Sequence, residues 1–179
     1  MDGYLFDTSI VIPNLRRHRH EHGLRVEARL RDLLARGDRG VVSVVTVGEV
    51  DFSYEVAALR GQEVTQERAA VDRFFREVTV LHVDTHTMSV CTPLRARIFD
   101  KYASRKNGRF REKVPERLRI SGHELVFDER DLLIVSTAIQ YNLVLALRDE
   151  QEGMRRIVEC AADMASGGVC AALRHESWN

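Results

Sequence analysis

Residues 41–50, Val-Val-Ser-Val-Val-Thr-Val-Gly-Glu-Val, join a strand pattern directly to a helix pattern. Residues 41–45 are rich in β-branched side chains, which predicts a strand buried on both faces. From Val47 to Tyr54 the apolar residues recur three and four apart, as on one face of a helix, and Glu49 lies off that apolar stripe. The stretch therefore predicts a buried strand that leads straight into a helix carrying Glu49.

The same alternation extends outward in both directions. Further apolar runs predict strands at residues 4–6, 78–83 and 143–147. Helical spacing separates them, with helices expected from Ile10, over 24–35, over 65–75, over 84–100 despite Pro93, and from Asp131. Strands separated by helices of this length imply crossover connections and a parallel sheet covered on both faces. We therefore expect a three-layer α/β/α sandwich with a mostly parallel central sheet.

Length and charge set the organisation that we expect. A chain of 179 residues is of single-domain size, and we assign residues 1–165 to one domain and 166–179 to a C-terminal tail. Lys and Arg number 27, as do Asp and Glu, so net charge argues neither for nor against a nucleic-acid partner. Any basic binding surface must be local.

The cysteines and the apolar runs bear on the compartment. Cys91, Cys160 and Cys170 form no C-x-x-C pair and are odd in number, unlike a secreted disulfide framework. The apolar run at residues 4–6 is too short for a signal peptide, and no run approaches the ~18 residues of a membrane span. We expect a cytoplasmic protein without a membrane partner, in which the cysteines are packing residues.

Four carboxylates follow strands or begin helices. Asp7 ends the first predicted strand and Asp149 follows the last, so both belong at the carboxyl edge where open parallel sheets bind ligands. Asp131 begins an apolar helix and Glu49 lies one turn into another, so both can face the same crevice. Carboxylates gathered in this way repel one another unless a divalent cation neutralises them, and oxygen ligands favour Mg²⁺, with Mn²⁺ as a substitute.

Such a cation can activate water for attack on a phosphodiester without a protein nucleophile. Each acid also has a purely structural interpretation: Asp7 as a helix cap, Asp131 as a helix N-terminal charge, Glu49 as a solvated residue and Asp149 as part of a turn. Asp128 could replace a ligand, although an N-cap role fits it better.

Four segments together resemble the ordered motifs of PIN-domain ribonucleases, especially VapC toxins. They are LFDTS at residues 5–9, VVSVVTVGEV at 41–50, DLLIVSTA at 131–138 and LVLALRD at 143–149. The resemblance implies a PIN-like fold and carries the metal-binding and catalytic roles to Asp7, Glu49, Asp131 and Asp149. Thr8 and Ser9 match the hydroxyl residues that commonly follow the first aspartate.

Two positions depart from that pattern. Leu147 stands where the family often has Thr, and Glu152 occupies the place of a further frequent aspartate. Asp149 is therefore the least secure of the four assignments, and whether Glu152 assists is open.

The resemblance also implies a biological role. It implies an Mg²⁺-dependent endoribonuclease, the toxin of a toxin–antitoxin pair, that cleaves a structured RNA and leaves a 5′-phosphate and a 3′-hydroxyl. It further implies a homodimer and a small antitoxin partner that blocks the acidic crevice. One alternative is a catalytically weak or inactive module that binds RNA or a protein. A phosphate-transferring α/β domain is disfavoured, because no D-x-D-x-T motif or Gly-rich phosphate loop is present.

A basic insertion is expected at about residues 101–125. Eight Lys or Arg residues lie between Lys101 and Arg119, against only Glu112 and Glu116. The candidate RNA contacts are Arg105, Lys106, Arg109, Arg111 and Lys113, and a solvated loop is the alternative. Phe110 or Tyr102 could stack on a base.

A second unusual segment contains alternating histidines. His18, His20 and His22 lie in an arginine-rich stretch, which indicates a flexible RNA-contacting loop more than a transition-metal site.

Overall fold

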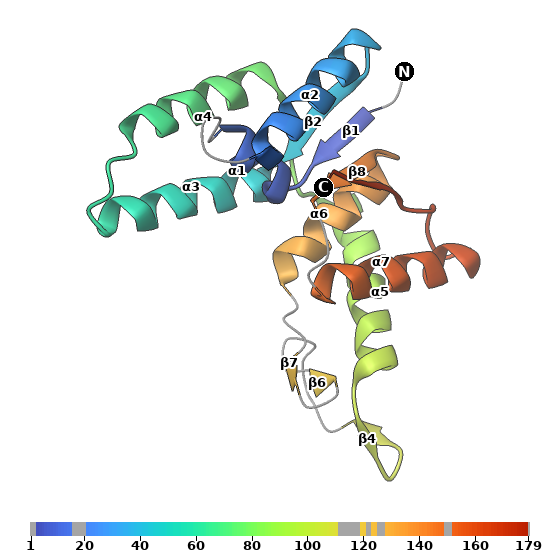
Figure 1. The fold of residues 1–179 in the computed structure, drawn as a ribbon. Coiled ribbons are helices and arrows are strands. Elements are labelled where there is room, and N and C mark those ends of the chain that lie inside the picture. The colour runs from blue at the N-terminus through green and yellow to red at the C-terminus, as the bar shows by residue number, and fades with distance from the viewer. Residues whose placement is uncertain are drawn as a thin grey trace. The chain divides into compact units, whose positions relative to one another are not determined.

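The computed structural model describes residues 3–15, 21–110, 119–120, 123–124, 128–148 and 152–178. The chain divides into two compact units, each described here by itself (Figure 1). The sheet unit contains Met1–Val83, Leu143–Asp149 and Arg174–Asn179, and the helical unit contains Asp84–Asn142 and Glu150–Leu173. The prediction of one domain over 1–165 stays a prediction.

The sheet unit is built on five parallel strands. They are β1 (Gly3–Phe6), β2 (Arg39–Ser43), β3 (Thr79–Leu81), β8 (Val144–Leu147) and β9 (Arg174–Ser177), in the order β3-β2-β1-β8-β9. In the register, Phe6 at the end of β1 lies between Val42 on β2 and Ala146 on β8. The predicted parallel sheet is confirmed, and the residue that follows β1 lies at the carboxyl edge of its central strand.

Four helices belong to this unit: α1 (Thr8–Leu15), α2 (Glu21–Ala35), α3 (Val44–Leu59) and α4 (Thr65–Glu77). Their apolar stripes form one core with one face of the sheet, in which Tyr4, Phe6, Ile10 and Val50 are buried together. Leu5 points to the opposite face of β1 and is fully buried as well. Both faces of the central strand are thus covered, as the α/β class requires.

The strand predicted at residues 41–45 ends earlier than expected. β2 stops at Ser43, and Val44 and Val45 already belong to α3. The Ser43 hydroxyl accepts a hydrogen bond from the Val45 backbone N–H at 3.2 Å, which makes Ser43 the N-cap of the helix. The β-branched run favours a strand, and the Ser43 cap overrides that preference at Val44 and Val45.

The segment assigned to a C-terminal tail, 166–179, contributes the fifth strand. β9 pairs in parallel with β8, from Arg174 opposite Val144 to Ser177 opposite Leu147. All four of its side chains are exposed, so this edge strand has no apolar alternation that a sequence pattern could detect. Trp178 follows it and is buried, with its ring 5.7 Å from that of Phe6.

The helical unit contains α5 (Thr85–Tyr102), α6 (Glu129–Gln140) and α7 (Glu152–Ser166), and α5 packs against both of the others. α5 begins with a capping box in which Asp84 and Thr87 exchange hydrogen bonds, and it contains Pro93 as predicted. None of the helices in the described part of the chain has the length and apolar character that a membrane crossing requires.

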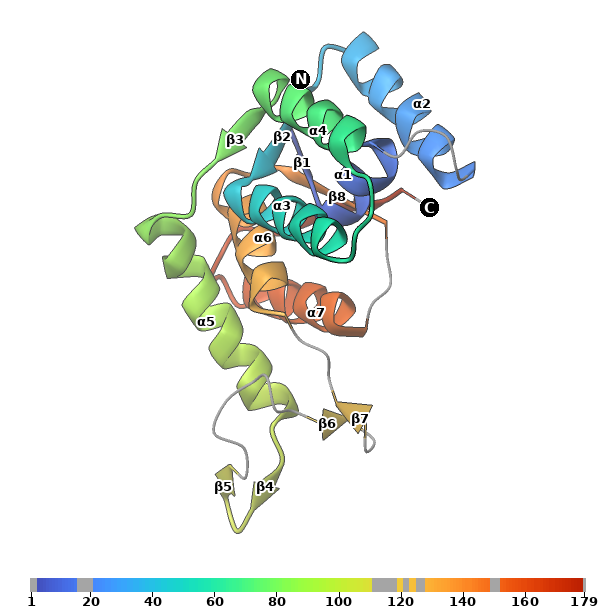
Figure 2. The same cartoon turned by 90° about the vertical axis from the view of Figure 1, so that its left-hand side faces the viewer.

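The expected basic insertion contains two short hairpins that were not foreseen. β4 (Arg105–Lys106) pairs with β5 (Arg109–Phe110), and β6 (Arg119–Ile120) pairs with β7 (His123–Glu124). Figure 2 shows the β4–β5 hairpin beyond the C-terminal end of α5. Pairs of two residues are too short to give a period in the sequence, which is why the insertion was predicted without strands.

Candidate acidic site

Asp7 occupies the junction between β1 and α1. Its backbone N–H donates to the Ala146 carbonyl of β8 at 3.0 Å, which continues the sheet by one residue. Its carbonyl accepts from the Ile10 and Val11 backbone N–H groups, so α1 starts directly after it, at Thr8 and not near Ile10 as predicted. The side chain is nearly buried, with 8% of the residue exposed.

The Asp7 carboxylate is held by Ser9. Its Oδ2 accepts from the Ser9 backbone N–H at 3.0 Å and from the Ser9 hydroxyl at 2.5 Å. This is the helix-capping role that the sequence left open for Asp7. The other oxygen, Oδ1, accepts no hydrogen bond from any described residue. Asp7 therefore caps α1 with one oxygen and retains a second for a ligand.

Ser9 also ties the corner to the end of β8. Its hydroxyl oxygen accepts a hydrogen bond from the Arg148 backbone N–H at 3.0 Å. Arg148 immediately precedes Asp149, which lies outside the described residues together with its predicted role. The link thus holds the chain beside Asp7 up to one residue before the fourth predicted acid.

Glu49 reaches the same corner through Thr8. The Thr8 hydroxyl donates to Glu49 Oε2 at 2.5 Å, from the first residue of α1 to the second turn of α3. Below it, the buried Thr46 hydroxyl donates to the Phe6 carbonyl at 3.5 Å and anchors α3 at the end of β1. Asp7, Thr8, Ser9 and Glu49 thus lie together at this corner. Thr46 was not predicted, because an inward threonine in a helix resembles any core residue.

Asp131 belongs to the helical unit. It lies half-buried in the first turn of α6, where the helix dipole favours a carboxylate. Asp128 is the N-cap of that helix, and its Oδ1 accepts from the Arg130 backbone N–H at 3.0 Å. The Arg130 side chain pairs with the same carboxylate and holds its pKa below the usual value. The N-cap interpretation of Asp128 is confirmed, and the convergence of Asp131 with Asp7 and Glu49 stays a prediction.

The donor chemistry of the corner fits a hard divalent cation. Asp7 and Glu49 supply carboxylate oxygens, which suit Mg²⁺ or Mn²⁺, and the nearby hydroxyls of Thr8 and Ser9 orient them. Within the described residues no three acidic, histidine or cysteine side chains lie close enough together to hold a metal ion. Asp149 lies outside those residues, and its assignment and that of Asp131 as further ligands stay predictions.

The other predicted residues are only partly described. Arg105, Lys106 and Arg109 lie exposed on the β4–β5 hairpin, whereas Arg111 and Lys113 fall outside the described residues. The side chains of His18, His20, His22 and Glu152 are likewise outside them. Cys91 and Cys160 are buried, and burial raises the pKa of each thiol, which agrees with their assignment as packing residues.

No family model matches the chain, and no curated protein matches it either. Its fold, however, matches solved VapBC complexes. A chain of VapBC2 from Rickettsia felis, bound to a promoter DNA fragment, aligns with a TM-score of 0.61, 16% identity and 99% coverage of both chains. A chain of VapBC-1 from nontypeable Haemophilus influenzae aligns at 0.60, with 19% identity and 98% coverage of both chains. A chain of DNA-bound VapBC from Salmonella typhimurium aligns with a TM-score of 0.58, 18% identity and full coverage of both chains.

At these identities the likeness defines the fold. The chain has a three-layer α/β/α fold of the PIN type, and the fold that its motifs led us to expect is confirmed.

Proposed function

We propose that the protein is an Mg²⁺-dependent endoribonuclease and the toxin of a toxin–antitoxin pair, acting in the cytoplasm. The observation that carries the proposal is the Asp7 corner, where a nearly buried carboxylate at the carboxyl edge of the central strand is fixed by Ser9. Glu49 joins it through the Thr8 hydroxyl. We assign Asp131 and Asp149 as the remaining ligands, as the motif resemblance implies.

The chain's own residues orient the acidic ligands. Ser9 fixes the rotation of the Asp7 carboxylate, and Thr8 does the same for Glu49, so neither acid must be ordered when a cation arrives. Mg²⁺, when bound, supplies Lewis-acid activation of water and stabilises the charge that builds on the phosphate oxygens. Hydrolysis adds one water oxygen to phosphorus and breaks the bond to the 3′ oxygen, which leaves a 5′-phosphate and a 3′-hydroxyl.

The proposed partners are those that the motif resemblance implies. A structured RNA is the substrate, and a second copy of the chain forms a homodimer. Because the solved neighbours are VapBC complexes, we propose a cognate antitoxin as well. A basic or aromatic side chain of that antitoxin would occupy the acidic crevice and block it.

Cleavage of a purified structured RNA, with Mg²⁺ and with EDTA, tests the proposal. We expect cleavage with Mg²⁺, none with EDTA, and none by Asp7→Asn in either condition. Asp32→Asn is the matched control, because Asp32 is an exposed helix residue of the same unit. Cleavage that persists in EDTA, or that Asp7→Asn retains, would contradict the proposal.

A second candidate is a module that binds RNA or a protein without cutting. The capping role of Asp7 favours it, because the helix start explains this carboxylate without any metal. RNA binding by the wild-type protein without cleavage in Mg²⁺ or Mn²⁺, together with growth arrest on expression of Asp7→Asn, would support this candidate.

A further inference from the structure

The β4–β5 hairpin has the geometry of a tight two-residue turn. Lys106 on β4 lies directly opposite Arg109 on β5 in the antiparallel register. Asn107 and Gly108 connect them with φ angles of 54° and 74°, the left-handed values that a type I′ turn requires. An Asn-Gly turn of this kind matches the twist of its strands, so the two cations are presented on a defined ribbon.

Contacts at the base of the hairpin use its aromatic ring and one of its charges. The ring of Phe110 lies 4.7 Å from that of Phe99 on α5, between centroids, and the Arg105 guanidinium lies 4.5 Å from the Phe110 centroid. Arg105 also pairs with the Asp100 carboxylate. The Phe110 ring thus contacts Phe99 and the Arg105 guanidinium while 42% of the residue stays exposed, and the charge of Arg105 is already countered.

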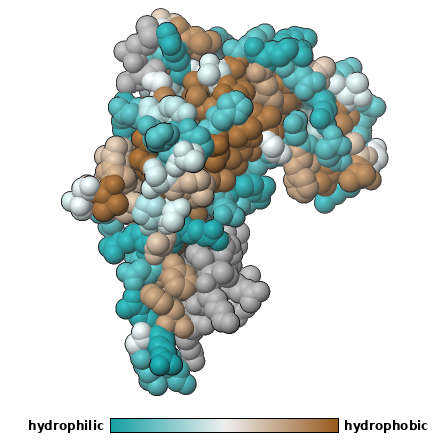
Figure 3. All heavy atoms as spheres, turned by 180° about the vertical axis from the view of Figure 1, so that it is seen from behind, coloured by the Kyte–Doolittle hydropathy of each residue, from teal (hydrophilic) through white to brown (hydrophobic). Residues whose placement is uncertain are grey.

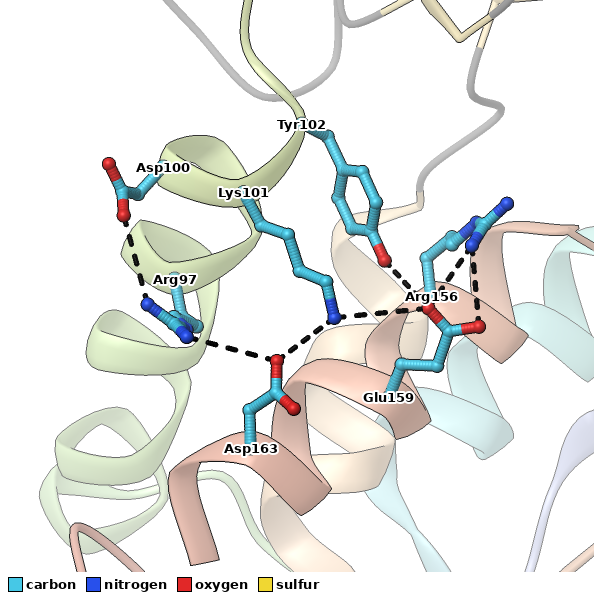
Figure 4. A network of polar contacts seen from close by, with 7 residues as sticks. All are labelled: Arg97, Asp100, Lys101, Tyr102, Arg156, Glu159 and Asp163. Atoms are coloured by element: carbon cyan, nitrogen blue, oxygen red, sulfur yellow. Dashed lines mark hydrogen bonds and ion pairs between the residues drawn. The ribbon is translucent and has the colours of Figure 1, made fainter. Parts of the chain in front are cut away.

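The end of α5 is secured in the same manner (Figure 4). Lys101 pairs with Asp163 of α7 at 2.9 Å, and the Tyr102 hydroxyl donates to Glu159 at 2.8 Å. The guanidinium of Arg156 lies 5.4 Å from the Tyr102 ring centroid. Both aromatic residues considered for base stacking, Tyr102 and Phe110, thus contact other parts of the helical unit.

The tip differs from this base. Lys106 and Arg109 are exposed, and neither forms an ion pair with a described residue. Like charges directly opposite on neighbouring strands destabilise a hairpin, so the tip carries a repulsion that nothing described around it relieves. The lowest part of the surface in Figure 3 is hydrophilic at this end of the unit. A polyanion bound across both side chains would convert that repulsion into attraction.

We propose that Lys106 and Arg109 together bind the sugar–phosphate backbone of a base-paired RNA stem. This rests on the proposed function, because it deepens the substrate class of the same enzyme. Proteins that hold single strands combine cations with free aromatic faces, whereas the Phe110 ring of this hairpin already contacts Phe99 and the Arg105 guanidinium. Stems are recognised through shape and phosphates, with little base readout, which the two cations can supply.

The test compares two RNAs that share one cleavage sequence, presented either in the loop of a stem-loop or in an unstructured strand. We expect Lys106→Ala/Arg109→Ala to lower kcat/KM on the stem-loop about tenfold. The slope of log(kcat/KM) against log[salt] should fall by the amount that about two phosphate contacts contribute. Cleavage of the unstructured strand should stay within twofold. Arg60→Ala/Arg73→Ala removes two exposed cations, one at the C-cap of α3 and one on α4, and should change neither.

A charge reversal separates the effect from misfolding. Lys106→Glu places opposite charges across the hairpin, so the Tm should equal or exceed that of the wild type while stem-loop cleavage falls at least tenfold. Unchanged stem-loop cleavage in both variants, or an equal loss on both RNAs, would overturn the proposal.

Binding distinguishes this proposal from the proposed function. If the wild-type protein cuts no RNA, the nuclease assignment fails by itself. The hairpin is then judged from the affinity of Asp7→Asn for the stem-loop, with and without Lys106→Glu. A tenfold weaker affinity for the stem-loop in the Lys106→Glu background supports the stem assignment. An unchanged affinity for the stem-loop overturns it, also where Lys106→Glu weakens only the binding of a protein partner.

Discussion

Asp7 and Asp163 are both carboxylates that accept hydrogen bonds, and they differ in what donates to them. Asp7, nearly buried after β1, takes its hydrogen bonds from the backbone and hydroxyl of the neutral Ser9. Asp163, exposed on α7, accepts from Lys101 at 2.9 Å and has Arg97 at 3.8 Å. Lys101 holds the pKa of Asp163 below its usual value.

The difference distinguishes a carboxylate that can receive a cationic ligand from one that already forms a structural ion pair. Neutral donors orient a carboxylate and leave its charge to be met by something that binds, such as a cation. Cationic donors orient a carboxylate and cancel its charge, so nothing further is needed. The Asp7 corner therefore suits the proposed cation, whereas the acids of the α5–α7 network in Figure 4 already have cationic partners.

The largest expected effect is the difference in kcat between the Asp7→Asn and Asp163→Asn variants. Asp7→Asn should lower kcat at least about a thousandfold, equivalent to about 4 kcal/mol, while Asp163→Asn stays within twofold. Asn caps helices as well as Asp does, so the Tm of Asp7→Asn should stay close to that of the wild type. RNA cleavage and thermal unfolding check both statements. A comparable loss of activity in Asp163→Asn would remove the distinction.

The second largest effect should be the loss of stability when the buried Trp178 ring, which follows β9, is removed. Trp178→Ala removes a buried ring beside Tyr4 and Phe6 and should lower the free energy of unfolding by about 3–4 kcal/mol. Denaturant unfolding measures the loss. Leu24→Ala is the control, because that side chain is 61% exposed and should change the stability by less than about 0.5 kcal/mol.

Ser9 should have an intermediate effect. Ser9→Ala removes the hydroxyl that joins the Asp7 carboxylate to the Arg148 backbone, and we expect kcat to fall about tenfold, or about 1.4 kcal/mol. More Mg²⁺ should also be needed for half-maximal rate, since the carboxylate then accepts from the backbone N–H of residue 9 alone. Ser9→Thr keeps a hydroxyl and should recover most of the rate. An Mg²⁺ requirement unchanged in Ser9→Ala would argue that Ser9 serves only the fold.

The smallest effect should be the pH dependence of the α5–α7 network. Lys101 lowers the pKa of Asp163, so the folded state binds this proton less readily than the unfolded chain does. The stabilisation is therefore fully present above the ordinary Asp pKa of about 4 and is lost as the pH falls below it. Unfolding measured from pH 7 to pH 3 should show a smaller decline for Asp163→Asn. An identical decline would exclude a contribution from this pair.

Sequence patterns predicted the central strands and the first acidic residues for one shared reason. Residues 4–6 and 143–147 are apolar on both faces, and Asp7 interrupts the first run at its end, so local periodicity carries the signal. The same reasoning missed β9 and misassigned residues 166–179, because an exposed edge strand has polar side chains on both faces. It also placed the end of β2 two residues late, because β-branched residues favour a strand locally, whereas the Ser43 cap starts α3 at Val44.

What the sequence determined by itself was the kind of fold, the place of Asp7 at the carboxyl edge of the sheet, where parallel strands end together, and the place of Glu49 in the helix after the second strand. Only the tertiary structure decided how those acids are held. The Ser9 link to Arg148 spans 139 residues, and the Thr8 link to Glu49 spans 41. The same holds for the basic segment. Lys101 pairs with Asp163, 62 residues away, whereas Lys106 and Arg109 have no ion-pair partner among the described residues. Hydrogen bonds between residues far apart in the chain leave no periodic pattern in the sequence, so only the tertiary structure reveals them.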